Sequence, residues 1–208
     1  MDWQALLLLG AFHGINPGMG WLFAVALGMQ RRSARGIWRA LPPIALGHTV
    51  AVGAVVLIAG LARLAVPTDS LNVLVALVLI TLGLYRLWRH RHPRFGGMQV
   101  GFRDLAIWSF LMASAHGAGL IVLPFVMPAS AAVAAAGHDH AHHVGAAGGH
   151  AAAMAVGLHT LAYFTVMVLA ASVVYHKLGL GLLRKAWFNV DWLWAGALIG
   201  AGIAVLSK

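Results

Sequence analysis

Long apolar stretches, interrupted only by short clusters of charged and turn residues, run along almost all of this 208-residue chain. Each approaches the roughly 20 residues that an α-helix needs to cross a lipid bilayer. Charged residues make up only 9% of the chain, against about a quarter in soluble domains. We therefore expect an all-α integral membrane protein with no separate soluble domain.

The apolar stretches predict six transmembrane helices. The expected spans cover approximately residues 5–29, 42–66 and 71–88 in a first half (1–95), and residues 105–127, 151–175 and 190–206 in a second half (96–208). Arginine and lysine cluster in alternate connections, which the positive-inside rule assigns to the cytoplasm. We expect both termini outside the cytoplasm. The formal charge of +9 then reflects topology and anionic lipid, and no nucleic-acid partner is expected.

Two short motifs occur once in each half and in the same order. AFHG (residues 11–14) is matched by SAHG (114–117), and HTVA (48–51) is matched by HTLA (159–162). An apolar span without histidine follows each pair. The pattern predicts a three-helix duplication, and because three is an odd number the second copy must be inverted. Inverted repeats with a binding site near the bilayer midplane are a recurrent plan of secondary transporters.

Each of these motifs places a histidine in an apolar span. The four are His13, His48, His116 and His159. An ionisable side chain inside a bilayer is costly and usually marks a functional site, although a neutral histidine can also serve as a packing device between helices. Their repeat-related positions favour function. Imidazole suits nickel, cobalt, copper and zinc, and it can shuttle protons near neutral pH.

The first span also contains a signal for a helix break. Proline removes a backbone donor, and glycines lower the helical preference further. A break could bring Met19 close to His13, whereas a simple kink would only shape helix packing. Backbone groups freed at membrane depth are tolerated where they are buried in protein or line a cavity. The residues of the expected break are Gly14, Pro17 and Gly18.

The stretch GAFHGINPGMG resembles the first-helix signature H-x-x-x-P-G-H-G of the nickel/cobalt exporter (NicO) family. ALGHTVAVGAVV is similar to the serine-histidine-threonine segment of that family's second helix, and VGLHTLAYF to its counterpart in the second half. The resemblance implies a six-helix fold of the lysine-exporter-type superfamily, built by a three-helix duplication. It covers the first, second and fifth spans and the central loop. The matching residues are His13, Pro17, Gly18, His48 and His159.

The chain departs from the family pattern at three positions. Met19 stands where the family has its second histidine, Asn16 where an acidic residue is common, and Gly47 where the family has serine. A thioether in place of an imidazole softens a metal site and favours cuprous ion. Methionine is equally a filler of irregular gaps in packing.

A histidine-rich segment lies in the expected outer loop, residues 128–150. Its alanine- and glycine-rich sequence is too flexible for a rigid site but can bind divalent metal weakly. NicO exporters often carry such a loop between their halves, so the resemblance implies metal capture or receipt; the alternative is a linker with incidental histidines. The candidate accessory ligands are His138, Asp139, His140, His142, His143 and His150.

We therefore expect a multi-pass protein of the bacterial inner membrane that transports a divalent or soft transition-metal cation, namely nickel, cobalt, copper or zinc. The expected midplane ligands are His13, His48, His116, His159, Met19 and Asn16.

The sequence predicts no enzymatic activity and no required cofactor, because it has no cysteine, nucleophile triad, carboxylate pair or phosphate loop. Two alternatives remain: a non-transporting membrane subunit of a larger complex, and a membrane protein that binds metal or haem on the same fold. Gly196 and Gly200 form a G-x-x-x-G face that could pack within the chain or support a homodimer.

Overall fold

The regular structure is helical throughout the parts of the chain that the computed structural model describes. These parts are residues 2–63, 65–88, 101–126, 141–178 and 190–206. Within them, α3 (Ala34–Ala62) and the segment Gly149–Lys177 are each long and apolar enough to cross a membrane. A third crossing is possible if the bent pair Phe102–Ala115 and Ala118–Val126 forms one span. The chain is therefore compatible with a membrane protein of two to three crossings by length and composition, with shorter apolar helices in the other expected spans.

The first expected span is divided by a short turn. Asn16 leaves the helical conformation, and its side-chain oxygen accepts a hydrogen bond from the amide of Gly18 at 2.9 Å. Gly20 then adopts φ 124°, which is strained for any residue with a Cβ. Gly14, which the sequence placed in the break, lies inside the helix before it. The parts of this span are α1 (Trp3–Ile15), the 3₁₀ turn η1 (Pro17–Met19) and α2 (Trp21–Gln30).

The second helix, α3 (Ala34–Ala62), begins well before the expected residue 42. The hydroxyl of Ser33 caps it by accepting a hydrogen bond from the amide of Arg35 at 3.3 Å. Pro42 and Pro43 therefore lie inside the helix. Proline is favoured in the first turn of a helix, which is why these residues resemble a start in the sequence.

The expected span 105–127 contains a sharp bend, because two helices meet there at an angle of 61°. The first ends at Ala115, His116 is its C-cap, and Gly117 has φ 70°. A Cβ at Gly117 would lie 2.9 Å from a methyl carbon of Leu82, so glycine fits both the backbone angle and the space. The two helices are α5 (Phe102–Ala115) and α6 (Ala118–Val126).

Three further helices complete the described chain. One of them begins at Ala141, inside the segment 128–150 that the sequence assigned to a flexible loop, and ends in a π-helical turn. Its outward face and those of α3 and the helix at 68–88 expose large apolar side chains, which suits contact with lipid. The three are α4 (Thr68–Trp88), α8 (Ala141–Val173, continued by η3, Val174–Leu178) and α10 (Val190–Leu206).

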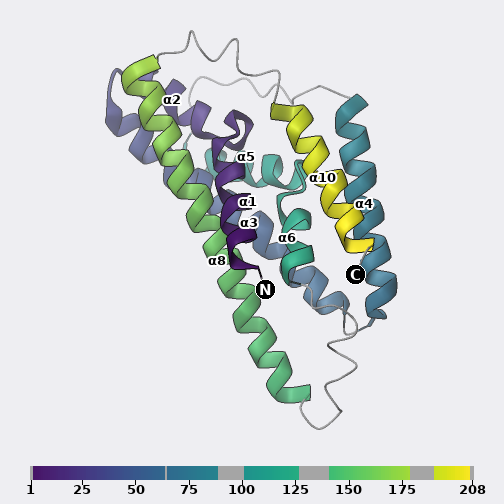
Figure 1. Ribbon diagram of the computed structural model, residues 1–208. Helices are drawn as coiled ribbons and strands as arrows, with labels where there is room; N and C mark the ends of the chain where they lie inside the picture. Colours follow the sequence, from purple (N-terminus) through teal and green to yellow (C-terminus); the bar gives the residue numbers. More distant parts are fainter. Residues whose placement is uncertain (1, 64, 89–100, 127–140, 179–189, 207–208) are drawn as a thin grey trace.

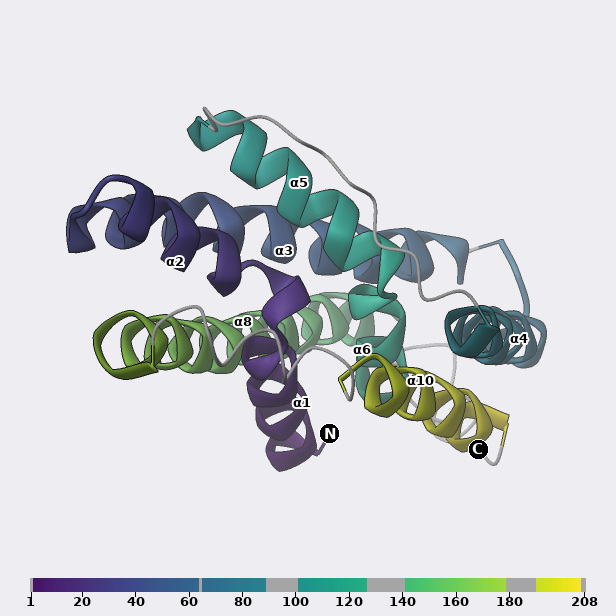
Figure 2. The ribbon, with the colours of Figure 1, turned by 90° about the horizontal axis from the view of Figure 1, so that it is seen from above.

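The helices pack in three principal pairs. α1 packs against α8, α3 against α5, and α4 against α10; α4 and α10 lie side by side in both views (Figures 1 and 2). In the expected duplication α1 corresponds to α5, α3 to α8, and α4 to α10. If the two halves are exchanged, the pair α1·α8 becomes the pair α5·α3, and the pair α4·α10 is unchanged.

Candidate functional site

The four histidines singled out by the sequence are all buried. His13 lies on α1, His48 on α3, His159 on α8, and His116 at the end of α5. None is more than 1% exposed. The structure thus places every one of these side chains inside the helix bundle, as an intramembrane ionisable residue requires.

Three of the four imidazoles lie together. The ring centroid of His13 is 5.3 Å from that of His48 and 4.8 Å from that of His159, and the last two are 5.7 Å apart. We call His13, His48 and His159 the histidine cluster. His116 lies apart from it and is related to it through Trp194, whose ring centroid is 4.2 Å from His13 and 6.4 Å from His116.

Two close helix–helix contacts bring these histidines together. A Cβ on Gly10 would overlap the carbonyl oxygen of His159, and one on Gly14 would overlap that of Tyr163, so α1 rests directly on the backbone of α8. A Cβ on Gly47 would likewise overlap the carbonyl oxygen of Ala106 on α5. Small residues permit this approach of helix backbones in membrane proteins. Gly14, the glycine of the first His-Gly motif, therefore serves packing, whereas Gly117 of the second motif lies at the bend between α5 and α6.

His13 and His116 share one hydrogen-bond pattern. Nδ1 of His13 lies 3.0 Å from the carbonyl oxygen of Leu9, and Nδ1 of His116 lies 2.8 Å from that of Met112, in each case four residues earlier. A carbonyl only accepts, so Nδ1 carries the proton and, in the neutral ring, the lone pair lies on Nε2. Metal-binding histidines are commonly oriented in this way, with the second nitrogen donating to a carbonyl.

Several buried nitrogens at the cluster have no hydrogen-bond partner among the described residues. They include Nε2 of His13, Nε2 of His48 and the ring nitrogen of His159 that does not face the backbone carbonyl of Leu6. Nδ2 of Asn16, a residue 3% exposed, is in the same state. Buried polar atoms are nearly always satisfied in folded proteins, so a group of unsatisfied donors and acceptors calls for a ligand, an ion or water.

Two aromatic residues that the sequence did not single out belong to this region. The ring of Tyr163 stacks on His48 with centroids 3.9 Å apart and planes inclined by 15°. Tyr163 follows His159 by four residues and hence shares its helix face, which was a usable signal. Trp194, 1% exposed, meets His13 edge-on. Nothing in the spacing of its apolar span distinguishes this tryptophan from an interfacial one.

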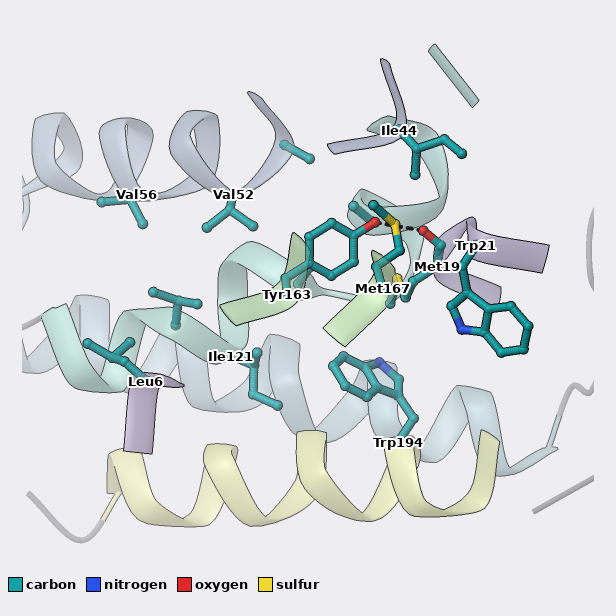
Figure 3. Close-up of a cluster of buried hydrophobic side chains, with 14 of the residues drawn as sticks. Leu6, Met19, Trp21, Ile44, Val52, Val56, Ile121, Tyr163, Met167 and Trp194 are labelled. Carbon is teal, nitrogen blue, oxygen red and sulfur yellow. Dashed lines mark hydrogen bonds between the residues drawn. The ribbon is translucent and has the colours of Figure 1, made fainter. Parts of the chain in front are cut away.

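Met19 lies at the helix break and is linked to the cluster through its backbone. The hydroxyl of Tyr163 donates a hydrogen bond of 2.8 Å to the carbonyl oxygen of Met19, drawn as the dashed line in Figure 3. The side chain of Met19 is buried with that of Met167 in the same apolar group, which also includes Trp21 (Figure 3). Asn16 turns its side-chain oxygen toward the amide of Gly18.

The rings of the histidine cluster are spaced as in a metal site, but they are not oriented to hold one ion. Three imidazoles around one ion, with metal–nitrogen bonds of about 2 Å, place their ring centroids about 5 Å apart, and the cluster is close to this. Within the described part of the chain, however, no three His, Asp or Glu side chains are arranged so that they hold one metal ion. Rotation of the rings about their side-chain bonds is therefore needed before they can share an ion.

Only part of the accessory histidine-rich segment lies within the described residues. His138, Asp139 and His140 lie outside the described residues, and His142 and His143 lie in the first turn of α8. His150 is exposed on α8.

The G-x-x-x-G face predicted on the last helix does not pack within the described chain. A Cβ on Gly196 or on Gly200 would meet nothing within 4 Å.

Comparison with protein-family models, with curated proteins and with solved structures finds no match to this chain.

Proposed function

We propose that this protein is a secondary transporter that moves a divalent or soft transition-metal cation across the bacterial inner membrane, with the histidine cluster as its central site. The observation that carries the proposal is the convergence of three buried imidazoles, from three different helices, with ring nitrogens that no group among the described residues satisfies. Such nitrogens are suited to nickel, cobalt, copper and zinc.

The inverted duplication is part of the same proposal. It is supported by the helix pairs α1·α8 and α3·α5, which exchange when the two halves are exchanged. The matching Nδ1 hydrogen bonds of His13 and His116 and the breaks that follow both residues support it as well. With six crossings, this arrangement corresponds to the fold implied by the resemblance to NicO exporters.

The arrangement favours a small ion over haem. Axial histidines bind haem from opposite faces of a wide macrocycle. The ring centroids of His13 and His159 are only 4.8 Å apart, and those of Tyr163 and His48 are 3.9 Å apart in a stacked arrangement. No space for a macrocycle separates these rings. An absorption spectrum of the purified protein without a haem band is the expected result.

The proposal is tested by metal uptake into proteoliposomes with nickel, cobalt, cuprous and zinc ions. His13→Ala and His48→Ala each remove one imidazole of the cluster, so we expect flux of the transported ion to fall by about 10- to 100-fold. His176→Ala is the matched control, because His176 is exposed at the end of α8. Equal flux in all four proteins would rule out the cluster as the transport site.

The non-transporting alternative makes a different prediction. A subunit that serves only assembly or metal delivery would co-purify with a larger complex and would support no metal flux after reconstitution alone. Wild-type flux in vesicles containing only this chain therefore separates the two functions.

A further inference from the structure

Tyr163 contacts both the histidine cluster and the break in the first span. Its ring stacks on that of His48, with centroids 3.9 Å apart and planes inclined by 15°. Its hydroxyl donates a hydrogen bond of 2.8 Å to the carbonyl oxygen of Met19, in the turn between α1 and α2 (Figure 3). The side chain is completely buried, so both contacts are made inside the protein.

The orientation of the three imidazoles explains why they do not share an ion as they stand. The lone pair of an imidazole nitrogen lies in the plane of its ring, so rings that share an ion must each point an edge at it. The rings of His48 and His159 are stacked instead, with planes inclined by only 17° and centroids 5.7 Å apart. The ring of His13 is inclined steeply to both, by 69° and 82°. One of the two stacked rings therefore has to turn before an ion can bind to all three.

Backbone contacts indicate that His48 is the ring that turns. Nδ1 of His13 lies 3.0 Å from the carbonyl oxygen of Leu9, and a ring nitrogen of His159 faces that of Leu6. Metal-binding histidines are commonly held in place by such contacts of their second nitrogen. His48 is held by an aromatic stack, and a stack is lost when the ring turns its edge to an ion.

We propose that Tyr163 is a positioning residue that couples ion binding at the histidine cluster to the helix break. Its ring holds His48 turned away from a shared ion, and its hydroxyl ties this arrangement to the carbonyl of Met19. The inference rests on the proposed function. Coupling between two equilibria is reciprocal, so an ion that draws His48 off Tyr163 loosens the turn, and a loosened turn lowers the cost of binding the ion.

The first test measures binding of Co²⁺ to the full chain in detergent through the visible bands of the bound ion. The part of the binding that is lost in His13→Ala belongs to the cluster. Tyr163→Leu removes the stack that opposes the turn of His48, so it should bind Co²⁺ more tightly than wild type by about twofold to tenfold. Phe164→Leu is the matched control and should bind as wild type does, because this half-buried ring points about 100° away around α8.

The second test measures hydrogen exchange of the amides of residues 16–20 with and without Co²⁺. In wild type the ion should raise this exchange by about twofold to tenfold, because loss of the stack weakens the hold of Tyr163 on Met19. Tyr163→Phe keeps the ring and loses the hydroxyl, so exchange at residues 16–20 should no longer respond to the ion. A hydroxyl that served stability alone would alter the exchange equally with and without Co²⁺.

The outcomes separate this inference from the proposed function. If Tyr163→Leu and Phe164→Leu bind Co²⁺ equally well, or if exchange in Tyr163→Phe still responds to the ion as in wild type, the coupling through Tyr163 is wrong while the metal site stands. If Tyr163→Leu does not fold, the exchange measurement on Tyr163→Phe decides alone. If cobalt, nickel, zinc and cuprous ions all bind to His13→Ala as they do to wild type, the cluster is not the site and the proposed function itself fails. Tighter binding confined to Tyr163→Leu, with ion-dependent exchange that Tyr163→Phe abolishes, supports the inference.

Discussion

The two broken spans, α1–α2 and α5–α6, start from the same His-Gly motif and reach different arrangements. In both, the histidine donates through Nδ1 to a carbonyl four residues earlier, and a glycine with positive φ follows, Gly20 in one and Gly117 in the other. In both, an aromatic donor from another helix satisfies a carbonyl at the break, Met19 or His116. Of these features only the Nδ1 hydrogen bond is local to the motif in both spans, since Gly20 lies outside the motif and the aromatic donors come from α8 and α10.

The differences come from the surrounding helices. The first break contains a proline and a 3₁₀ turn, and its histidine joins His48 and His159. The second is a single bend of 61°, and the ring centroid of its histidine lies 6.4 Å from that of Trp194. The local backbone thus orients both histidines in the same way, whereas the surrounding helices decide which other imidazoles each one meets.

The largest effect is expected from substitutions that disturb the close contacts of α1 with α8 and of α3 with α5. Gly10→Ala and Gly47→Ala place a Cβ against the carbonyl oxygens of His159 and Ala106, respectively, and neither helix backbone can move aside without losing other contacts. Each should lower the free energy of unfolding by about 3 kcal/mol. Tryptophan fluorescence during thermal or denaturant unfolding in detergent measures the change.

Gly157→Ala is the control for that comparison, because a Cβ there meets nothing within 4 Å. Its stability should equal or slightly exceed that of wild type, since alanine is the better helix former. If Gly10→Ala were as stable as this control, the direct contact of α1 with α8 would be refuted.

A smaller effect is expected from Tyr163→Phe, which removes the hydroxyl that donates to Met19 and leaves that buried carbonyl unsatisfied. The free energy of unfolding should fall by about 1 kcal/mol. Hydrogen exchange of the amides around residues 16–20 should rise, while exchange around Gly117 stays unchanged. A rise at both breaks would mean that the two breaks form one cooperative unit.

Asn16→Ala tests how much the turn of the first broken span depends on its side-chain hydrogen bond. The variant loses the side-chain acceptor for the amide of Gly18, so the free energy of unfolding should fall by about 1 kcal/mol. Asn16→Asp keeps an oxygen in that place and should retain more of the stability. Ser114→Ala, at an exposed position before the second break, should change it by less than about 0.5 kcal/mol.

The smallest effect is expected at the edge of the histidine-rich segment. His150→Ala alters an exposed side chain far from the cluster, so unfolding should change by less than about 0.5 kcal/mol. Flux at saturating metal should equal that of wild type. A large fall in saturated flux would place this segment on the transport path rather than beside it.

The sequence contained enough to predict a helical protein and the burial of four histidines, because both follow from apolar length and from the cost of a polar group in lipid. It also marked Pro17 as a place where the first span would break. It did not mark Gly117, since a single glycine inside an apolar run is tolerated in helices at a cost of about 1 kcal/mol. The contact with Leu82 that favours the bend is visible only in three dimensions.

The parts of the site that were missed share one cause. In a span where nearly every residue is apolar, periodicity does not separate the face that is buried in protein from the face that meets lipid. Trp194 was therefore indistinguishable from ordinary apolar filling until its neighbours were known, whereas Tyr163 could have been found from its spacing of four residues from His159. Gly10 and Gly47 likewise gained a meaning only from the backbone of the helix they contact.

Trp194 has no counterpart in the first half, since the only tryptophan of α4 is Trp88, which is 93% exposed. In the proposed transporter the two halves therefore offer unequal surroundings to an ion. Without an applied gradient the two opposing fluxes must still balance. A face that half-saturates at a lower metal concentration should therefore have a maximal rate that is lower in the same proportion.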